Sequence, residues 1–369
     1  MSGQQSKAGR VMVYILNSGN LYGTERMALA TLAGMDEYKR RVVFAPRPLG
    51  TASVATAARE AGMEAVSFQT RWDFIRALLP FFLRYRSVDV IGTGVAQGYM
   101  CHVLAKLMLV RLRQLQVTHG GTEDWHAYGR KRLLNRIPVR VVAVSDFVRS
   151  KLEEHGVRPH AISVIENFLA DAQISKYPQR RPYDPALPSA SPVDPARVRV
   201  AIVSRVNPIK KVDLLVAAIE RHGLAEFQFD VYGTGKDLET LEARSAVLPN
   251  IRFHDFVGDV HQRMADADFL LHLCPDEPFG LVILEAFLSR IVAIVPDAGG
   301  AGGLVEPGKT GVRFRAGDID DLALALQRAR SASGESLQRL ADAGRATLDS
   351  KFSQREGVRR YREALATEV

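Results

Sequence analysis

Short segments of continuously apolar residues recur along both halves of this chain, and segments with a helical pattern separate them. Examples are residues 11–16 in the first half and residues 198–203 and 291–296 in the second. Buried strands that alternate with helices are typical of open α/β sheets. A chain of 369 residues with 47% hydrophobic residues is long enough to form two such domains, each with its own core. The sequence therefore predicts the α/β class and two domains.

A proline-rich segment marks the boundary between the two predicted domains. Residues 177–197 are polar and are not expected to hold a regular helix, because proline interrupts the backbone hydrogen bonds of a helix. The prolines of this segment are Pro178, Pro182, Pro185, Pro188, Pro192 and Pro195. We interpret residues 1–176 as the first domain, residues 177–197 as the linker and residues 198–352 as the second domain.

Two carboxylates surround a Phe-Gly turn between a predicted strand, 268–273, and a predicted helix, 281–287. The turn follows the carboxyl end of a strand, where open α/β sheets bind ligands. A helix N-terminus favours a diphosphate, and Gly280 allows close approach of the backbone. Glu285, about one turn into the helix, is placed to accept ribose hydroxyls, and Glu277 is placed to reach a sugar. This acidic motif predicts a nucleotide-sugar site.

Two cations follow another predicted strand of the second domain. Arg205 comes directly after the strand that begins at residue 198, and Lys210 lies beyond the turn at Pro208. Fixed positive charge stabilises a diphosphate leaving group, because negative charge builds on that group as the glycosidic bond breaks. We therefore predict that Arg205 and Lys210 clamp the diphosphate of a nucleotide-sugar.

These motifs resemble those of the retaining GT-B glycosyltransferases, most closely glycosyltransferase family four (glycosyl transferases group 1). The resemblance covers nearly the whole chain and rests mainly on the acidic motif and the Arg-x4-Lys clamp. It implies the GT-B fold, in which two Rossmann-like domains face each other across a cleft. It also implies that residues 353–369 form a last helix that crosses back to the first domain.

The resemblance assigns roles to individual residues. The catalytic residues would be His119, Glu277, Arg205 and Lys210, with His119 hydrogen-bonded to the donor sugar near its anomeric centre. The donor-binding residues would be Gly23, Gly233, Phe256, Phe279, Gly280, Leu281 and Glu285. Non-glycine residues stand at four positions where the family usually has glycine: Tyr22, Phe168, Lys211 and Arg290. Gly303 stands where the family usually has glutamate.

The function implied by the resemblance is transfer of a sugar from a nucleotide-diphosphate-sugar, the co-substrate, to the hydroxyl of an acceptor glycan, glycolipid or small molecule. Retention favours same-face substitution, and double displacement stays open. A GT-B sugar-nucleotide 2-epimerase and a non-catalytic nucleotide-sugar-binding protein are the alternatives. A dinucleotide-binding fold is disfavoured, because Gly233 and Gly235 lack the third glycine of that motif.

No metal and no other cofactor is expected. The pair Asp266 and Asp268 leads into a predicted strand, and the pair Asp318 and Asp320 opens a predicted helix, so both are interpreted as structural. Two cysteines are too few for a disulfide framework, and Cys274 is expected to be a small core residue.

Positive charge is concentrated in the first half of the chain. Residues 1–170 carry 23 Lys and Arg against 13 Asp and Glu, a balance of +10, whereas residues 171–369 have a balance of −2. Cations and aromatic residues lie together in residues 71–86, which suits an anionic membrane surface or an anionic acceptor. No nucleic-acid-binding motif accompanies this charge. With no apolar run of about 18 residues and no leader, a cytoplasmic location is expected, with peripheral contact to the inner membrane face.

Overall fold

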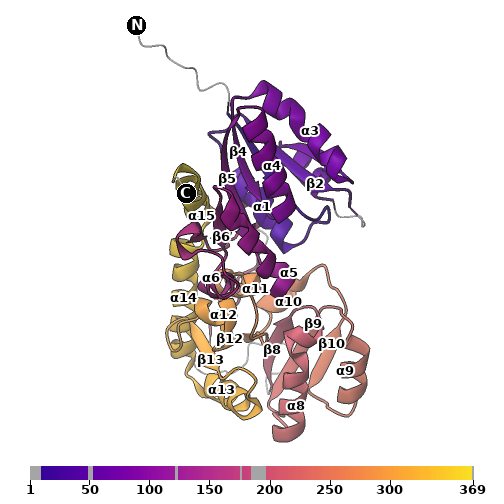
Figure 1. The fold of residues 1–369 in the computed structure, drawn as a ribbon. Helices are drawn as coiled ribbons and strands as arrows, with labels where there is room; N and C mark the ends of the chain where they lie inside the picture. Colours follow the sequence, from indigo (N-terminus) through magenta and orange to yellow (C-terminus); the bar gives the residue numbers. More distant parts are fainter. Residues whose placement is uncertain (1–9, 49–52, 121–123, 175–176, 184–196, 368–369) are drawn as a thin grey trace. The chain divides into compact units, whose positions relative to one another are not determined.

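The structure is a computed structural model that describes residues 10–48, 53–120, 124–174, 177–183 and 197–367. The chain divides into two compact units. The first unit comprises Met1–Phe168 and Gln354–Val369, and the second comprises Leu169–Ser353. Figure 1 shows that each unit consists of a sheet with helices packed on its faces.

The first unit has a seven-stranded parallel sheet in the order β3-β2-β1-β4-β5-β6-β7. Its strands are β1 (Arg10–Ile15), β2 (Arg40–Pro46), β3 (Glu64–Phe68), β4 (Ser87–Gly92), β5 (Arg111–Thr118), β6 (Arg140–Ala143) and β7 (Ile162–Val164). Its helices are α1 (Gly23–Ala33), α2 (Val54–Glu60), α3 (Arg71–Arg84), α4 (Val95–Leu107), α5 (Asp124–Ala127), α6 (Asp146–Glu154) and α15 (Gln354–Ala366), with the 3-10 helices η1 (Gly129–Arg136) and η2 (Pro159–Ala161).

The second unit has a six-stranded parallel sheet in the order β10-β9-β8-β11-β12-β13. Its strands are β8 (Val198–Val203), β9 (Phe227–Tyr232), β10 (Ile251–His254), β11 (Phe269–Leu271), β12 (Val292–Pro296) and β13 (Gly311–Phe314). Its helices are α7 (Asp171–Ile174), α8 (Val212–His222), α9 (Leu238–Ser245), α10 (Val260–Ala265), α11 (Leu281–Leu288), α12 (Gly299–Leu304), α13 (Ile319–Ser331) and α14 (Gly334–Lys351), with the 3-10 helix η3 (Pro208–Lys210). The predicted α/β class with two domains is confirmed.

The strand order reverses at one point in each sheet. In the first unit the reversal lies between β1 and β4, and in the second it lies between β8 and β11. The connections from these strands leave on opposite faces, which opens a crevice at the carboxyl ends of the strands. Ligands of open α/β sheets bind in such crevices, so the loops after β1, β4, β8 and β11 are where a site is expected.

The boundary between the units differs from the predicted linker. Residues 184–196 of that linker lie outside the described residues, but residues 177–183 pack into the second unit. The buried Arg180 donates a hydrogen bond to Asp268 at 2.7 Å, and its guanidinium lies 3.6 Å from the ring centre of Tyr183. The Tyr183 hydroxyl accepts a hydrogen bond from the Val292 backbone at the start of β12. These contacts attach residues 177–183 to the amino-terminal edge of the second sheet.

Helix α15 belongs to the first unit although it lies far along the sequence from the rest of it. It packs against α1 and β5, and it buries Tyr361. Gly357 leaves the space for the buried ring of Phe168, since a Cβ at this glycine would lie only 2.0 Å from that ring. Arg360 donates a hydrogen bond to Glu166 at 2.7 Å. Helix α15 thus packs against Glu166 and Phe168, at the point where the chain leaves the first unit.

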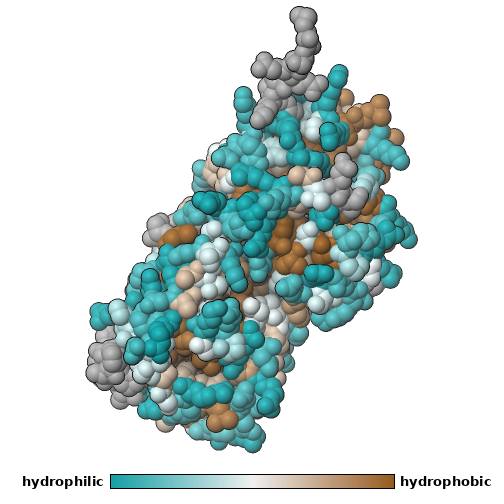
Figure 2. All heavy atoms as spheres, turned by 90° about the vertical axis from the view of Figure 1, so that its left-hand side faces the viewer, coloured by the Kyte–Doolittle hydropathy of each residue, from teal (hydrophilic) through white to brown (hydrophobic). Residues whose placement is uncertain are grey.

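The surface of the chain is largely hydrophilic on the face drawn in Figure 2, where hydrophobic residues form separate patches. Among the described residues, no helix combines the length and the apolar character needed to cross a membrane.

Candidate active site

Two cations of the second unit lie at the carboxyl end of β8. Arg205 lies beyond Ser204, which follows the strand, and Lys210 ends η3. The next residue, Lys211, adopts the left-handed conformation with φ of 56° and serves as the N-cap of α8. Left-handed backbone is the conformation that glycine adopts without steric cost. This explains why glycine is usual in the family at a position where this chain has lysine.

Lys210 and Glu277 form an ion pair at the carboxyl ends of β8 and β11. The Lys210 ammonium donates a hydrogen bond to Glu277 Oε2 at 2.5 Å, and both side chains are largely buried. Burial raises the pKa of Glu277, but the charge and hydrogen bond of Lys210, with the charge of Arg205, outweigh burial and hold this pKa below its ordinary value. Glu277 is therefore an ionised carboxylate, and Arg205 lies close enough to act on its charge.

Glycines shape the loop that carries Glu277. Gly280 has φ of 97° and is the N-cap of α11, and Gly299 has φ of 69°. A Cβ at Gly299 would lie 2.4 Å from the Pro275 carbonyl oxygen. The Gly300 N–H donates a hydrogen bond to the Glu277 carbonyl at 2.7 Å. The loop between β11 and α11 is therefore supported by the turn that begins α12.

His272 and Cys274 lie beside Glu277 and were not singled out from the sequence as site residues. His272 Nε2 is 3.5 Å from Glu277 Oε2, and this nitrogen is buried without a hydrogen-bond partner in the part of the chain that is described. Burial, assisted by the charge of Lys210, lowers the pKa of His272 to about 4. The sequence contained a signal for this pair. His272 and Cys274 are two positions apart just after a buried strand, and in extended backbone such side chains point to the same side.

An apolar cavity of about 210 Å³ lies at the carboxyl ends of β8 and β9. The predicted residues Arg205, Gly233 and Phe256 all line it. Phe256 is 83% exposed, so this apolar residue of the cavity lining is open to solvent. Gly233 has φ of 140°, and a Cβ there would lie 2.0 Å from the Ser204 carbonyl oxygen. These strand ends approach so closely that only glycine fits between them.

Glu285 lies on α11, and its carboxylate accepts a hydrogen bond from the Tyr177 hydroxyl at 2.8 Å. The ring of His261 lies 3.9 Å from the ring of Tyr177. Sequence analysis placed Tyr177 in the linker, so its contact with a site residue was missed. Phe279 is buried and packs edge-on against Phe352, with ring centres 6.0 Å apart. The ring of Phe279 is therefore part of the packing of the second unit.

In the first unit, His119 follows β5 at the carboxyl edge of the sheet. Its Nε2 is buried and has no hydrogen-bond partner among residues that the structure describes. Burial, together with the charge of Lys131, lowers the pKa of His119 to about 4, so the imidazole is neutral near pH 7. The buried Lys131 donates hydrogen bonds to the carbonyls of Thr93 at 2.7 Å and Val117 at 3.3 Å. Lys131 thereby ties the end of β4 to the end of β5.

Gly23 is the first residue of α1, directly after the loop that follows β1, and it is exposed. Glu25 is buried, and its carboxylate accepts a hydrogen bond from the Tyr22 backbone N–H at 3.2 Å. This is the capping-box arrangement that fixes a helix start. The Glu25 carboxylate is thus engaged in holding the loop that contains Gly23.

One aspartate of each Asp pair has a structural role. Asp268 is buried in its ion pair with Arg180, and Asp318 caps α13 by accepting hydrogen bonds from the N–H groups of Asp320 and Asp321. The donor atoms of His272, Cys274 and Glu277 lie within 4.8 Å of one another, a spacing at which they could hold a metal ion. A cation there would have to compete with the Lys210 ammonium for the same Glu277 oxygen.

Residues 197–331 match the model of the family described as Glycosyl transferases group 1. The chain is 29% identical over 138 residues to sulfoquinovosyl transferase SQD2 of Arabidopsis thaliana, covering 36% of this chain and 27% of that protein. It is 27% identical over 253 residues to D-inositol 3-phosphate glycosyltransferase of Rhodococcus erythropolis, covering 63% of this chain and 54% of that protein. The chain thus spans about half, or less, of the length of these relatives.

Among solved structures, the chain resembles that of Anabaena Alr3699/HepE in complex with UDP. The TM-score is 0.77 and the sequence identity 18%, with 96% of this chain and 99% of that chain covered. The same Anabaena protein has also been solved with UDP-glucose. This likeness, with the two parallel sheets, confirms the GT-B fold predicted for the chain.

Proposed function

We propose that this chain is a glycosyltransferase that moves a sugar, with retention of anomeric configuration, from a nucleoside-diphosphate-sugar to an acceptor hydroxyl. The observation that carries the proposal is the cluster of Arg205, Lys210 and Glu277 beside an apolar cavity. This cluster lies in the region that matches the group 1 glycosyltransferase model. Cations for a diphosphate, a carboxylate for a sugar and a cavity for a base meet at one sheet edge.

Donor binding follows from the chemistry of each part. The cavity lined by Phe256 and Gly233 suits a nucleobase, because its walls are apolar and an exposed ring is available for stacking. Glu285 is placed for the ribose hydroxyls. Helix α11 begins at Leu281, and the N-terminus of a helix suits a diphosphate. This assignment is supported because the cavity, Glu285 and α11 all belong to the second unit.

Charge neutralisation without a metal is part of the proposal. Arg205 and Lys210 supply two fixed cations, and guanidinium and ammonium groups form strong, charge-assisted hydrogen bonds with phosphate oxygens. Glu277 holds Lys210 in place before the donor arrives. When a diphosphate binds, Lys210 is shared between the Glu277 carboxylate and the phosphate oxygens.

The proposed reaction is a same-face substitution. The bond between the anomeric carbon and the diphosphate oxygen breaks while the acceptor oxygen forms a bond on the same face. The proton of the acceptor hydroxyl passes to the departing phosphate oxygen. A double displacement would need a free carboxylate nucleophile. Glu277 is paired with Lys210, and Glu25 is engaged in its capping box, and both facts favour the same-face route.

His119 has the role of a neutral hydrogen-bonding group in this proposal. Its pKa of about 4 keeps the imidazole uncharged near pH 7, so it does not oppose the positive charge that develops on the sugar. We propose that its Nε2, which has no hydrogen-bond partner among the described residues, bonds to a hydroxyl of the donor sugar. Lys131 supports this neutrality, because a second positive charge beside Lys131 would be unfavourable.

The acceptor is proposed to be a glycan, a glycolipid or a small molecule, with an anionic membrane surface as a partner of the first unit and a cytoplasmic location. Helix α3 supports the membrane contact. It buries Phe74, Leu78, Phe81 and Phe82 and leaves an outer face of Trp72, Arg76, Leu83 and Arg84. Trp72 is 71% exposed and Leu83 is 77% exposed. Apolar and cationic groups on one outer face suit an anionic interface.

A thermal-shift screen of nucleoside-diphosphate-sugars tests the proposal and identifies the donor. A ligand at 100 times its dissociation constant stabilises the folded state by about 2.7 kcal/mol, which is readily measured. NMR analysis of products, with and without candidate acceptors, then determines the anomeric configuration. Absence of any stabilising nucleotide-sugar, or a product of inverted configuration, would contradict the proposal.

A further inference from the structure

Three kinds of metal-binding side chain meet just beyond β11 in the second unit. They are the His272 imidazole, the Cys274 thiol and the Glu277 carboxylate, and one ligand atom of each lies within 4.8 Å of the other two. His272 and Cys274 are buried, and the Glu277 side chain is 16% exposed. The described part of the chain contains no second group of three such side chains at this spacing.

The buried His272 has a ring nitrogen that no hydrogen bond satisfies. His272 is 5% exposed, and its Nε2 has no hydrogen-bond partner among the described residues. By contrast, His222 and His254 each place Nε2 within 2.9 Å of an aspartate oxygen. A buried polar atom without a partner is costly, because it has lost its hydrogen bonds to water. The His272 Nε2 atom would therefore gain from a ligand.

The spacing of these atoms fits a tetrahedral metal ion. His272 Nε2 is 3.5 Å from Glu277 Oε2. Zinc lies about 2.0 to 2.2 Å from nitrogen and oxygen ligands, so two such ligands at a tetrahedral angle are about 3.4 Å apart. The Cys274 Sγ atom lies within 4.8 Å of its two neighbours and needs a shift of about 1 Å to complete such a site. A small side-chain rotation supplies that shift.

The chemistry of the three ligands selects the kind of ion. A thiolate with an imidazole favours zinc and similar ions, whereas magnesium and calcium prefer sites made of oxygen ligands. Burial lowers the pKa of His272 to about 4, so its imidazole is neutral near pH 7, as metal binding requires. Burial raises the pKa of the Cys274 thiol to about 11, so the ion must displace the thiol proton.

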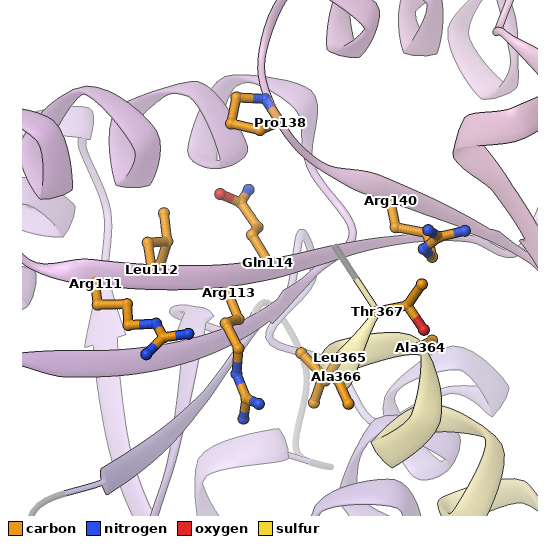
Figure 3. A pocket seen from close by; sticks show the side chains of 10 residues that line it. All are labelled: Arg111, Leu112, Arg113, Gln114, Pro138, Arg140, Ala364, Leu365, Ala366 and Thr367. Carbon is orange, nitrogen blue, oxygen red and sulfur yellow. The ribbon is translucent and has the colours of Figure 1, made fainter. Parts of the chain in front are cut away.

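A second cavity, of about 330 Å³, offers no comparable ligands. It lies in the first unit between β5, the start of β6 and the end of α15, as Figure 3 shows. Of the described residues that line it, none is His, Cys, Asp or Glu. The metal-binding side chains are therefore found at the carboxyl edge of the second sheet and not at this cavity.

We propose that His272, Cys274 and Glu277 bind a zinc-like divalent ion, with an oxygen ligand in the fourth position. The ion takes the Glu277 oxygen to which the Lys210 ammonium otherwise donates its hydrogen bond. The Glu277 carboxylate and a Cys274 thiolate supply two negative charges, which balance the two positive charges of the ion. Lys210 then has no role as a counter-charge. The ion and the Lys210 ammonium are thus alternative occupants of one position.

The consequence is inhibition, and this step rests on the glycosyltransferase function proposed above. In that function Glu277 contacts the sugar of the donor. An ion bound to Glu277 withdraws this carboxylate from the sugar and fills the space beside it. The ion is therefore expected to stop a reaction that itself needs no metal.

Cobalt(II) tests for the site directly, because a bond between cobalt and a thiolate adds a charge-transfer absorption band. The full chain, reduced and stripped of metal by a chelator, is titrated with cobalt chloride. The band should saturate at about one equivalent, and zinc chloride should abolish it by displacement. Cys274→Ala should lose the band. Cys101→Ala, which changes the other cysteine of the chain and is also buried, is the matched control and should keep it.

Calorimetry with zinc chloride tests the other two ligands. His272→Asn should weaken zinc binding by about 100-fold or more, since loss of an outer-shell partner alone costs about 10- to 100-fold. Its control is the exposed His160, changed to Asn, which should leave binding unchanged. Circular dichroism melting shows whether each variant is folded.

Lys210→Ala should have the opposite effect on zinc binding. It removes the competitor for the Glu277 oxygen, so zinc should bind about tenfold tighter or more, because a charge-assisted hydrogen bond no longer has to be broken. Lys309→Ala, which changes an exposed lysine, should leave the affinity unchanged. A gain in affinity cannot result from misfolding. Equal or weaker zinc binding in Lys210→Ala would show that the ion and the ammonium do not compete.

Steady-state kinetics at buffered zinc concentrations tests the inhibition. Zinc should inhibit the wild type and Cys101→Ala, EDTA should restore both, and Cys274→Ala should resist zinc when compared with itself in EDTA. If cobalt gives no band, or if Cys274→Ala retains it, the site is overturned. If the band depends on Cys274 but saturating zinc leaves turnover unchanged, the inhibition is overturned and the glycosyltransferase function stands. If no donor is turned over even in EDTA, that function fails, whereas the cobalt and zinc titrations still decide the site.

Discussion

The Lys210 ammonium and the Glu277 carboxylate are joined by a hydrogen bond of 2.5 Å, although 67 residues separate them in the sequence. Lys210 was assigned to a diphosphate and Glu277 to a sugar, as if the two acted independently. Their contact means that the Lys210 charge stabilises the ionised Glu277 carboxylate. Sugar recognition and phosphate neutralisation are therefore expected to be coupled through this pair.

Removing either clamp cation should slow turnover and should leave the reaction independent of metal. Lys210→Ala and Arg205→Ala should each lower kcat by about 100-fold or more, because the leaving diphosphate loses a fixed positive charge. Steady-state kinetics with and without EDTA measures both effects. Lys309→Ala, which changes an exposed lysine paired with Glu306, is the matched control. Full activity of Lys210→Ala, or loss of wild-type activity in EDTA that magnesium restores, would contradict the metal-free clamp.

Replacing Glu277 by glutamine should separate the two parts of the donor. Glu277→Gln keeps the size of the side chain but releases Lys210 from its ion pair. The nucleoside diphosphate should then bind as tightly as before or a few-fold tighter, whereas the intact nucleotide-sugar should turn over about 100-fold more slowly. Calorimetry and kinetics on the same preparation test this. An equal loss of affinity for both ligands would show that Glu277 does not contact the sugar.

A substitution of Glu285 should test whether this residue binds the ribose of the donor. Glu285→Ala should weaken binding of the nucleoside diphosphate by about tenfold or more even without a sugar, because hydrogen bonds to a charged carboxylate contribute about 1.5 to 3 kcal/mol. Tyr177→Phe removes only the hydroxyl that orients this carboxylate, and it should have a smaller effect in the same direction. Calorimetry compares the two. Unchanged affinity in Glu285→Ala would remove Glu285 from the donor site.

His272 should make the protein less stable in mild acid. Its pKa is about 4 in the folded state against 6.5 ordinarily, so below pH 6.5 the unfolded chain takes up a proton that the folded chain refuses. The free energy of unfolding therefore falls between pH 6.5 and 4, by about 2 kcal/mol at pH 4.8 from this residue. Urea unfolding at pH 7.5 and 4.8 should show a smaller loss in His272→Asn. The exposed His160, changed to Asn, should leave the loss as in the wild type.

The outer face of α3 should bind anionic membranes in a salt-sensitive way. The chain should sediment with anionic vesicles at low salt and not with neutral ones, since each nearby cation contributes about 1 kcal/mol. Reversal of Arg76, Arg84 and Arg86 to Glu should abolish sedimentation and leave donor binding intact. Trp72→Ser with Leu83→Ser tests the apolar part. If the wild type remains in the supernatant with anionic vesicles, membrane binding through this face is excluded.

Much of the fold was predictable because buried parallel strands are short, continuous and apolar. The predicted strand at 268–273 and helix at 281–287 correspond to β11 and α11. Glycine supplied a second signal, since Gly233 and Gly280 adopt positive φ at the site itself. Lys211 and Arg290 show the limit of that signal. Both replace the family's usual glycine, and both still have positive φ, of 56° and 59°.

Contacts between distant segments could not be predicted. Tyr177 lies in a proline-rich stretch that has the composition of a linker, yet its hydroxyl reaches Glu285, more than 100 residues further on. His272 was interpreted only as part of a strand, although its alternation with Cys274 was visible in the sequence; its burial is a property of the folded chain. The roles of the predicted site residues stay predictions until the variants above are measured.

The position of α15 has a consequence for the order of events on the ribosome. Residues 354–366 pack against α1 and β5, but the entire second unit is synthesised between those elements and this helix. The second unit can therefore fold while the first still lacks its closing helix, which leaves apolar surface of α1 and β5 open to chaperones and proteases. The first unit can close only after residues 354–366 have left the exit tunnel.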